Sequence, residues 1–252
     1  MKKIISMLLV LSMMFAVLAA CNNETPVENP DVPDNQEIQG GEVDDGMLHL
    51  VVDGASDYVI VRGENAYISE VTASTELQKY LKQITGVELP IVTDSAAPVE
   101  KEIVVGKTNR ESDGEFDREE LGDDGFVIKS NGKKLFLVGG EQRGTLYSVY
   151  EFLEAYLGCR FYTSSFEKIP ETQTLSLEQI AEDKQIPVFE TRETYWIDYM
   201  GSSSLSAKRR MNGGKCTTRP AELGGSNSWV GWTAHTQWSF FAEQISIPNS
   251  LV

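Results

Sequence analysis

Three groups of residues in the sequence have types and spacings that could do chemistry. The thiol of Cys21 directly follows a short apolar stretch, where it could be acylated. Arg143 lies in a glycine-rich turn, where a guanidinium and backbone N–H groups could bind a carboxylate or a phosphate. Further along, His235 stands in a segment that holds all the tryptophans, whose rings can stack on sugar faces (Trp196, Trp229, Trp232 and Trp238).

Residues 1–20 have the three parts of a secretory signal peptide. Two lysines precede an apolar stretch over residues 4–17, and small residues follow it. The stretch is shorter than the roughly 20 residues that a membrane-spanning helix needs. Leu18-Ala19-Ala20-Cys21 resembles a lipobox, in which the cysteine receives a diacylglyceryl group. We therefore expect an exported lipoprotein on the extracytoplasmic side of the cell membrane; the alternative is an ordinary secreted protein.

Residues 21–46 are predicted to be the lipidated cysteine and a disordered tether. Residues 22–46 hold eight acidic residues, three prolines and no lysine or arginine. Such a composition buries too little apolar surface to offset the entropy lost on ordering. Its like charges and prolines favour an extended chain that holds the folded part away from the lipid.

Composition excludes several classes of function. The net charge is −16, and no basic face of the kind that binds nucleic acid is evident. With two histidines and no Cys-x-x-Cys pair, we expect no metal site, and no motif indicates a cofactor. Cys159 lies in an apolar run and is predicted to be buried. A disulfide between Cys159 and Cys216 remains an alternative after export.

Residues 47–186 have the regular patterns of a folded domain. Apolar residues at helical spacing predict helices from Thr72 to Gly86, with Thr72 or Ser74 as N-cap, and over residues 146–157. Asn131-Gly132 between two apolar runs predicts a hairpin over residues 125–140. Further strands are expected at residues 48–52, 58–61, 88–93, 102–105, 160–163 and 174–180. Two helices on a largely antiparallel sheet give an α+β two-layer sandwich.

Four segments of this domain resemble a known accessory domain. They are residues 76–90, 102–106 (Glu-Ile-Val-Val-Gly), 139–154 (beginning Gly-Gly-Glu-Gln-Arg-Gly) and 157–162 (Leu-Gly-Cys-Arg-Phe-Tyr). The domain precedes the catalytic barrel in bacterial α-glucuronidases of glycoside hydrolase family 67 and in β-hexosaminidase-like enzymes. The resemblance covers about residues 56–180, and it implies a domain that supports a barrel and is not itself catalytic. Arg143 would then either bind an anion or, as we favour, bridge to the next domain.

Residues 187–252 resemble the start of a TIM barrel in an uncharacterised family of bacterial surface proteins. Val188 to Trp196 matches the opening strand, and Arg192 and Glu193 match a pair at its end. A later stretch, Gly-Trp-Thr-Ala-His-Thr, includes Trp232 and His235. Because barrel sites form at the C-terminal ends of strands, these residues would line a pocket.

The predicted barrel is incomplete, because a whole one needs at least roughly 200 residues. Glycoside hydrolysis normally uses two carboxylates, and Glu193 alone cannot supply both. We therefore expect the N-terminal part of a glycoside-hydrolase-like protein that acts on a polysaccharide or oligosaccharide, without activity as this sequence stands. The alternative is a non-catalytic surface lipoprotein that binds glycans or serves as a scaffold. We expect substrate contacts, if any, from Arg192, Glu193, Trp232, His235 and Arg143, and no catalytic residue.

Overall fold

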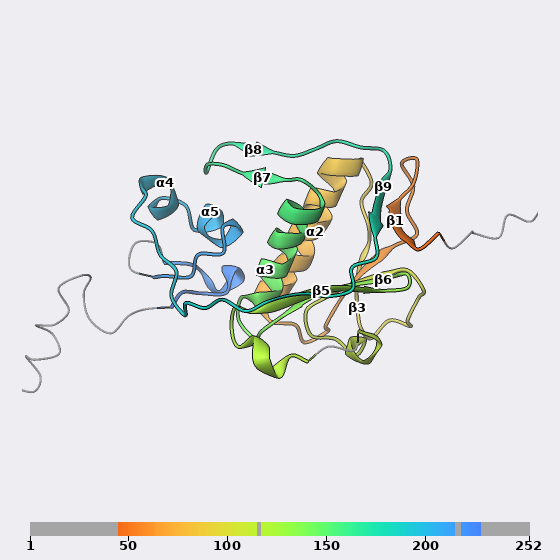
Figure 1. Ribbon diagram of the computed structural model, residues 1–252, viewed down its shortest axis with the longest axis horizontal. Helices are drawn as coiled ribbons and strands as arrows, with labels where there is room; N and C mark the ends of the chain where they lie inside the picture. The colour runs from red at the N-terminus through yellow and green to blue at the C-terminus, as the bar shows by residue number, and fades with distance from the viewer. Residues whose placement is uncertain (1–44, 115–116, 215–217, 228–252) are drawn as a thin grey trace, which may run out of the picture. The chain divides into compact units, whose positions relative to one another are not determined.

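The computed structural model describes residues 45–114, 117–214 and 218–227 (Figure 1). All of these residues belong to one compact unit of the chain. The expected signal peptide, Cys21 and most of the tether lie outside the described residues, as do Cys216, Trp229, Trp232, His235 and Trp238. Predictions that concern them therefore remain predictions.

The structure forms ten strands and four α-helices in the described residues. The strands are β1 Met47–Val51, β2 Val59–Arg62, β3 Ile91–Thr93, β4 Glu102–Val105, β5 Phe126–Asn131, β6 Lys134–Gly139, β7 Arg160–Phe161, β8 Glu167–Lys168, β9 Leu175–Glu178 and β10 Asp183–Gln185. The α-helices are α2 Ile68–Thr85, α3 Gly144–Glu151, α4 Ile197–Met200 and α5 Ser203–Lys208, and a π-helix, Phe152–Tyr156, continues α3. Short 3-10 turns lie at Glu111–Asp113, Glu119–Leu121 and Ala221–Leu223.

The central sheet has six strands in the order β10-β5-β6-β4-β2-β3. The pairs β2–β3, β2–β4 and β4–β6 are parallel, whereas β5–β6 and β5–β10 are antiparallel. Two small antiparallel sheets, β1–β9 and β7–β8, stand beside it. The predicted α+β class is confirmed. The central sheet itself is mixed, because α2 is a crossover that returns the chain parallel to β2, a connection that a hairpin cannot make.

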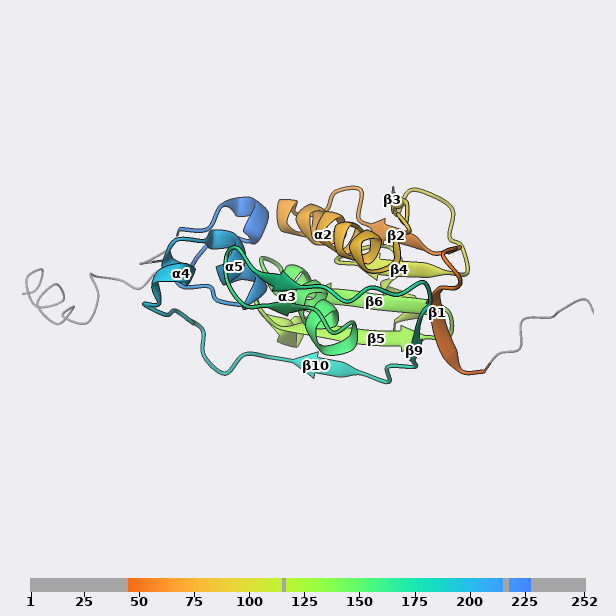
Figure 2. The same cartoon turned by 90° about the horizontal axis from the view of Figure 1, so that it is seen from above.

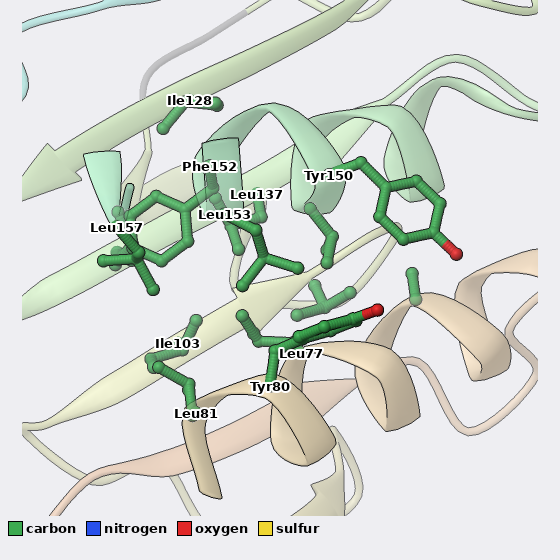
Figure 3. Close-up of a cluster of buried hydrophobic side chains, with 14 of the residues drawn as sticks. Leu77, Tyr80, Leu81, Ile103, Ile128, Leu137, Tyr150, Phe152, Leu153 and Leu157 are labelled. Atoms are coloured by element: carbon green, nitrogen blue, oxygen red, sulfur yellow. The ribbon is translucent and has the colours of Figure 1, made fainter. Parts of the chain in front are cut away.

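Helices α2 and α3 cover one face of the sheet, which gives the predicted two layers (Figure 2). Their buried side chains meet those of the strands in the main core, where Leu77 and Tyr80 of α2 approach Tyr150 and Leu153 (Figure 3). The strands alternate between faces. Their other side chains form a second, smaller cluster that Leu121 covers (Val104, Val127, Phe136 and Val138).

Helix α2 begins earlier than its apolar pattern indicates. The predicted caps, Thr72 and Ser74, lie inside the helix, and their hydroxyls donate to backbone carbonyls one turn back, at Ile68 and Val71. The start is fixed instead by Glu70, whose carboxylate accepts the backbone N–H of the N-cap residue at 3.0 Å. The predicted stop is confirmed, because Gly86 takes the left-handed conformation with φ +78°.

The hairpin of β5 and β6 is formed as predicted, with its turn shifted by one residue. Asn131 is the last residue of β5 and pairs with Lys134, so Gly132 and Lys133 make the turn. Gly132 has φ +59°, as the first central position of a type II′ turn requires. The asparagine side chain instead donates to the carbonyl of Asp113 at 2.7 Å.

The barrel strand predicted over residues 188–196 is not formed in the structure. A strand needs a neighbouring strand for its backbone groups. Here the N–H of Arg192 donates to the side-chain oxygen of Asn212 at 2.7 Å, and its carbonyl accepts the N–H groups of Asn212 and Gly213. The described part of residues 187–252 thus does not confirm the incomplete barrel, which remains a prediction. No helix within the described ranges is long and apolar enough to cross a membrane.

Candidate functional site

The glycine-rich turn before α3 is packed against backbone. A Cβ on Gly140 would lie 1.7 Å from the carbonyl oxygen of Gly122, so no larger residue fits there. The N–H of Gly144, which could have bound an anion, donates to the carbonyl of Asp123 at 2.9 Å. The turn therefore joins α3 closely to the loop before β5, and these backbone groups are already used within the chain.

Arg143 crosses from this turn to the segment that follows the domain. Its side chain is fully buried. The guanidinium donates to the carboxylate of Asp124, to the carbonyl of Gly224 at 3.0 Å and to the side chain of Asn227 at 3.1 Å. A fourth bond goes to the side chain of Gln142. Of the two alternatives that the sequence left open, these contacts favour the bridging role.

Asp124 is the centre at which the two predicted arginines meet. One carboxylate oxygen accepts from Arg143, and the other accepts from Arg192 at 2.9 Å and from the amide of Asn212. Asn212 is fully buried and also donates to the carbonyl of Glu190 at 2.7 Å. We call Asp124, Arg143, Arg192 and Asn212 the Asp124 cluster. It joins residues 123–144 of the domain to residues 190–212 beyond it.

Arg192 is held from several sides, so its position is well defined. Its Nε donates to the carbonyl of Arg210 at 2.9 Å, and Nη1 donates to the carbonyl of Phe189 at 2.8 Å. The guanidinium lies 5.8 Å from the ring centre of Tyr147, whose hydroxyl donates to the carbonyl of Met211 at 3.1 Å. Burial, together with the charge of Asp124, raises the pKa of Tyr147 to about 12.

Glu193 belongs to the same segment and packs against Gly213. It is half-buried, and its side chain fills the space beside Gly213, where a Cβ would lie 2.4 Å from the Cβ of the glutamate. Next to it, the buried Arg219 donates from both terminal nitrogens to the carbonyl of Gly213, at 2.8 and 2.9 Å. Burial lowers the pKa of Arg219, and the charge of Glu193 opposes this shift.

Cys159 and Trp196, which the sequence analysis also singled out, differ in their exposure to solvent. Cys159 is fully buried, as its apolar run predicted, and burial raises the pKa of its thiol to about 11. Trp196 is 68% exposed, together with its neighbour Tyr195 at 63%. Trp196 is therefore available for contact with a ligand, while Cys159 belongs to the core.

A cleft of about 430 Å³ adjoins the Asp124 cluster. It lies between the loop at residues 120–125 and the chain at residues 186–192, and Phe189 and Asn227 contribute to its walls. Asp124 and Arg192 line this cleft and are already paired with each other. Such a pair is better suited to holding two segments together than to transferring a proton. Among the described residues no group of His, Cys, Asp and Glu is arranged to hold a metal ion.

The sequence prediction reached two members of the cluster and missed two. Arg143 and Arg192 were singled out, and the structure brings them to one carboxylate. Asp124 and Asn212 were missed. A signal for Asp124 was present, because Asp123-Asp124-Gly125 directly precedes the strongest hairpin pattern of the sequence. Nothing in the sequence around Asn212 indicates its role.

Comparison with known proteins agrees with the resemblance described above. Residues 51–152, less than half of the chain, match the family model of the glycosyl hydrolase family 67 N-terminus. This part of the chain is therefore similar to a glycoside hydrolase accessory domain, and the similarity indicates carbohydrate metabolism. A search of curated proteins found no match.

Three solved structures match part of the chain at low sequence identity. BtGH115A, a family GH115 4-O-methyl-α-glucuronidase with specificity for decorated arabinogalactans, is 15% identical over 75% of this chain and 30% of its own, with a TM-score of 0.46. The Streptomyces plicatus N-acetyl-β-hexosaminidase is 12% identical over 66% and 30%, with a TM-score of 0.40. A family GH138 enzyme targeting pectin rhamnogalacturonan II is 13% identical over 69% and 19%, with a TM-score of 0.41. The chain spans less than a third of each of these structures.

Proposed function

We propose that residues 47–186 are the accessory domain of a surface-anchored carbohydrate-active protein and hold the following segment in place through the Asp124 cluster. The observation that carries this proposal is the set of three donors on the single carboxylate of Asp124, two of which come from beyond the domain. Charged groups that are buried and paired in this way fix geometry, because removing one partner leaves the others uncompensated. A domain that positions its neighbour needs such a joint.

Limited proteolysis of the full chain tests this role. Asp124→Asn keeps the size of the side chain and removes its charge, so we expect faster cleavage within residues 187–227 while residues 47–186 stay resistant. Asp123→Asn is the matched control, because its side chain is 49% exposed and lies 3.6 Å from Arg143. Equal cleavage rates in the two variants would show that the cluster does not hold the segment.

We further propose that the protein has no hydrolytic activity as this sequence stands. Glu193, the carboxylate that the resemblance places at a strand end, is packed against Gly213 and supplies only one of the two carboxylates that glycoside hydrolysis normally uses. The full chain should give no turnover of aryl-glucuronides or aryl-N-acetylglucosaminides above background. Turnover that Glu193→Gln abolishes would overturn this proposal.

We also propose that an acyl group on Cys21 anchors the protein to the membrane. A cysteine directly after small residues, followed by an acidic proline-containing stretch, supports it. Two acyl chains anchor a protein stably where one binds marginally. Metabolic labelling with palmitate should mark the protein and should fail for Cys21→Ala. Labelling that persists in this variant would place the acyl group elsewhere.

A non-catalytic glycan-binding role is the second candidate, and the exposed aromatic residues at Tyr195 and Trp196 favour it. Exposed rings can act as platforms for sugar faces. Retention on xylan or mucin glycans should fall for Trp196→Ala or Trp232→Ala if the segment binds. Unchanged retention in both variants would remove this segment from consideration.

A further inference from the structure

A second cleft, of about 460 Å³, lies away from the Asp124 cluster. It opens between the π-helix, the β7–β8 hairpin and the α4–α5 segment, and its walls include Glu154, Arg160, Tyr162, Tyr199 and Arg209. In Figures 1 and 2 the β7–β8 hairpin extends from the end of α3 toward α5. The volume falls in the range of about 300–1,000 Å³ that is usual for small-molecule sites.

Arg160 presents one edge of its guanidinium without a partner. Its Nη1 is fixed by the carbonyls of Glu154 and Cys159, at 2.5 and 2.6 Å. The first of these carbonyls belongs to the last turn of the π-helix, where intrahelical donors run out. Within residues 45–114, 117–214 and 218–227, Nε and Nη2 of Arg160 have no hydrogen-bond or ion-pair partner. These two N–H groups form the parallel pair of donors that matches a carboxylate.

The carboxylates that line the cleft are paired with arginines other than Arg160. Glu154 is buried and accepts from Arg209 at 2.7 Å and from Arg210 at 2.6 Å. Arg210 also lies 3.2 Å from the carboxylate of Glu151. These two carboxylates are thus paired with the two arginines from beyond the domain, and neither of them pairs with Arg160. An anionic group entering the cleft would meet the charge of Arg160 uncompensated.

An aromatic surface stands beside the arginine. Tyr162 is 54% exposed and stacks on Phe166, with ring centres 5.7 Å apart and planes 20° apart. The hairpin that carries both rings is fastened to α4, because the backbone N–H of Ser164 donates to Asp198 at 2.9 Å and its hydroxyl donates to the same carboxylate at 2.5 Å. The ring of Tyr162 is therefore held at the wall of the cleft before any ligand arrives, which lowers the entropy lost on binding.

From this combination we propose that the cleft binds a saccharide that bears a carboxylate, with Arg160 pairing with the carboxylate and Tyr162 contacting the sugar ring. A fixed arginine fork supplies specificity for the acid, and an aromatic face supplies contact area for the apolar side of a pyranose. The proposal rests on the proposed function in carbohydrate metabolism. It adds a binding site within the accessory domain itself, formed together with α4 and α5.

Calorimetric titration of the full chain with a galacturonate tetrasaccharide tests the proposal, with a neutral xylo-oligosaccharide of the same length as the reference ligand. We expect the acidic ligand to bind more tightly and to lose affinity as salt is added. Arg160→Gln should weaken its binding by about ten-fold or more, as expected for the loss of a charge-assisted pair. Lys168→Gln is the matched control, because Lys168 is exposed, pairs with Arg160 across β7 and β8 and does not line the cleft.

Further variants separate binding from folding. Arg160→Lys keeps the charge but loses the fork, and Tyr162→Ala removes the ring; each should weaken the acidic ligand by several-fold while the melting temperature stays near that of the wild type. If Arg160→Gln fails to fold, the affinities of Arg160→Lys and Tyr162→Ala for the acidic ligand test the site instead. Equal affinity of the acidic ligand for the wild type and for the Arg160 and Tyr162 variants would overturn the site. If the wild type binds neither oligosaccharide, the site as proposed is also overturned, while the proteolysis test of the Asp124 cluster still stands on its own.

Discussion

Two regions of the protein are held together by different kinds of contact. The main core is apolar, and most of its thirty buried side chains come from α2, α3 and the strands. The segment after residue 187 adds few apolar side chains to this core, chiefly Leu205 and Ala207 of α5. It is attached instead by ionic and amide contacts at Asp124, at Glu154 and at Glu167.

This difference has consequences for how each region fails. Apolar burial is non-directional and is spread over many residues, so it depends little on pH and salt. A buried charge that loses its partner is uncompensated, so an ionic joint depends strongly on each of its few members. We therefore expect mutations in the core to lower the stability of the whole domain, and mutations in the joints to release the following segment first.

The largest effect should come from removing a buried ring. Phe152 is fully buried between α3 and the sheet and stacks on Tyr156, with ring centres 5.7 Å apart. Phe152→Ala should lower the free energy of unfolding by about 3–5 kcal/mol, since the contacts are lost and a cavity remains. Urea unfolding of the full chain measures this. Phe189→Ala is the control, because that ring is 72% exposed, and its effect should be within about 0.5 kcal/mol.

The next largest effect should come from the joint. Arg143→Met removes the cation that pairs with Asp124 and should destabilise the attachment of residues 187–227 by about 3 kcal/mol, because a buried carboxylate loses a partner. Hydrogen exchange should show faster exchange at Asn212 and Gly213 than at the amides of α2.

A surface pair provides the comparison for this variant. Arg118 pairs with Glu111 at 2.8 Å, and both side chains keep some solvent contact. Arg118→Met should therefore change local exchange by less than about 1 kcal/mol. If Arg143→Met instead lowers the stability of α2 and of the segment equally, the two regions unfold as one and the distinction between them is wrong.

The sequence predicted the apolar region far better than the joints, for a physical reason. Helix and hairpin patterns are local: the spacing of Leu77, Tyr80 and Leu81 and the Asn131-Gly132 pair each report on a few neighbouring residues. Asp124 lies 68 residues from Arg192 and 88 from Asn212, so their meeting depends on the whole fold. The sequence also did not predict the parallel strands. Strand β2 pairs in parallel with β3 because the long helix α2 connects the two, and this pairing again depends on contacts between distant residues.

The smallest effect should be a pH dependence at the joint of α5 with the β7–β8 hairpin. Glu167 accepts from Lys208 and, at 2.8 Å, from the hydroxyl of Tyr80, while Lys208 lies 5.2 Å from the ring centre of Phe161. Burial alone would raise the pKa of Glu167, but the bonds from Lys208 and Tyr80 outweigh it and lower the pKa below its ordinary value of 4.5.

Because the folded-state pKa of Glu167 is the lower one, its stabilising contribution is complete above about pH 4.5 and is lost as the pH falls through the folded pKa. Hydrogen exchange of the α5 amides, measured from pH 6 to pH 3 and corrected for intrinsic rates, should show this loss in the wild type. Glu167→Gln should remove the pH-dependent part that belongs to this group, and Glu88→Gln, at an exposed ion pair, should leave it in place. A wild-type profile that matches Glu167→Gln across the range would mean that the α5 joint does not depend on this ion pair, and the contrast between ionic joints and apolar core would then rest on the Asp124 cluster alone.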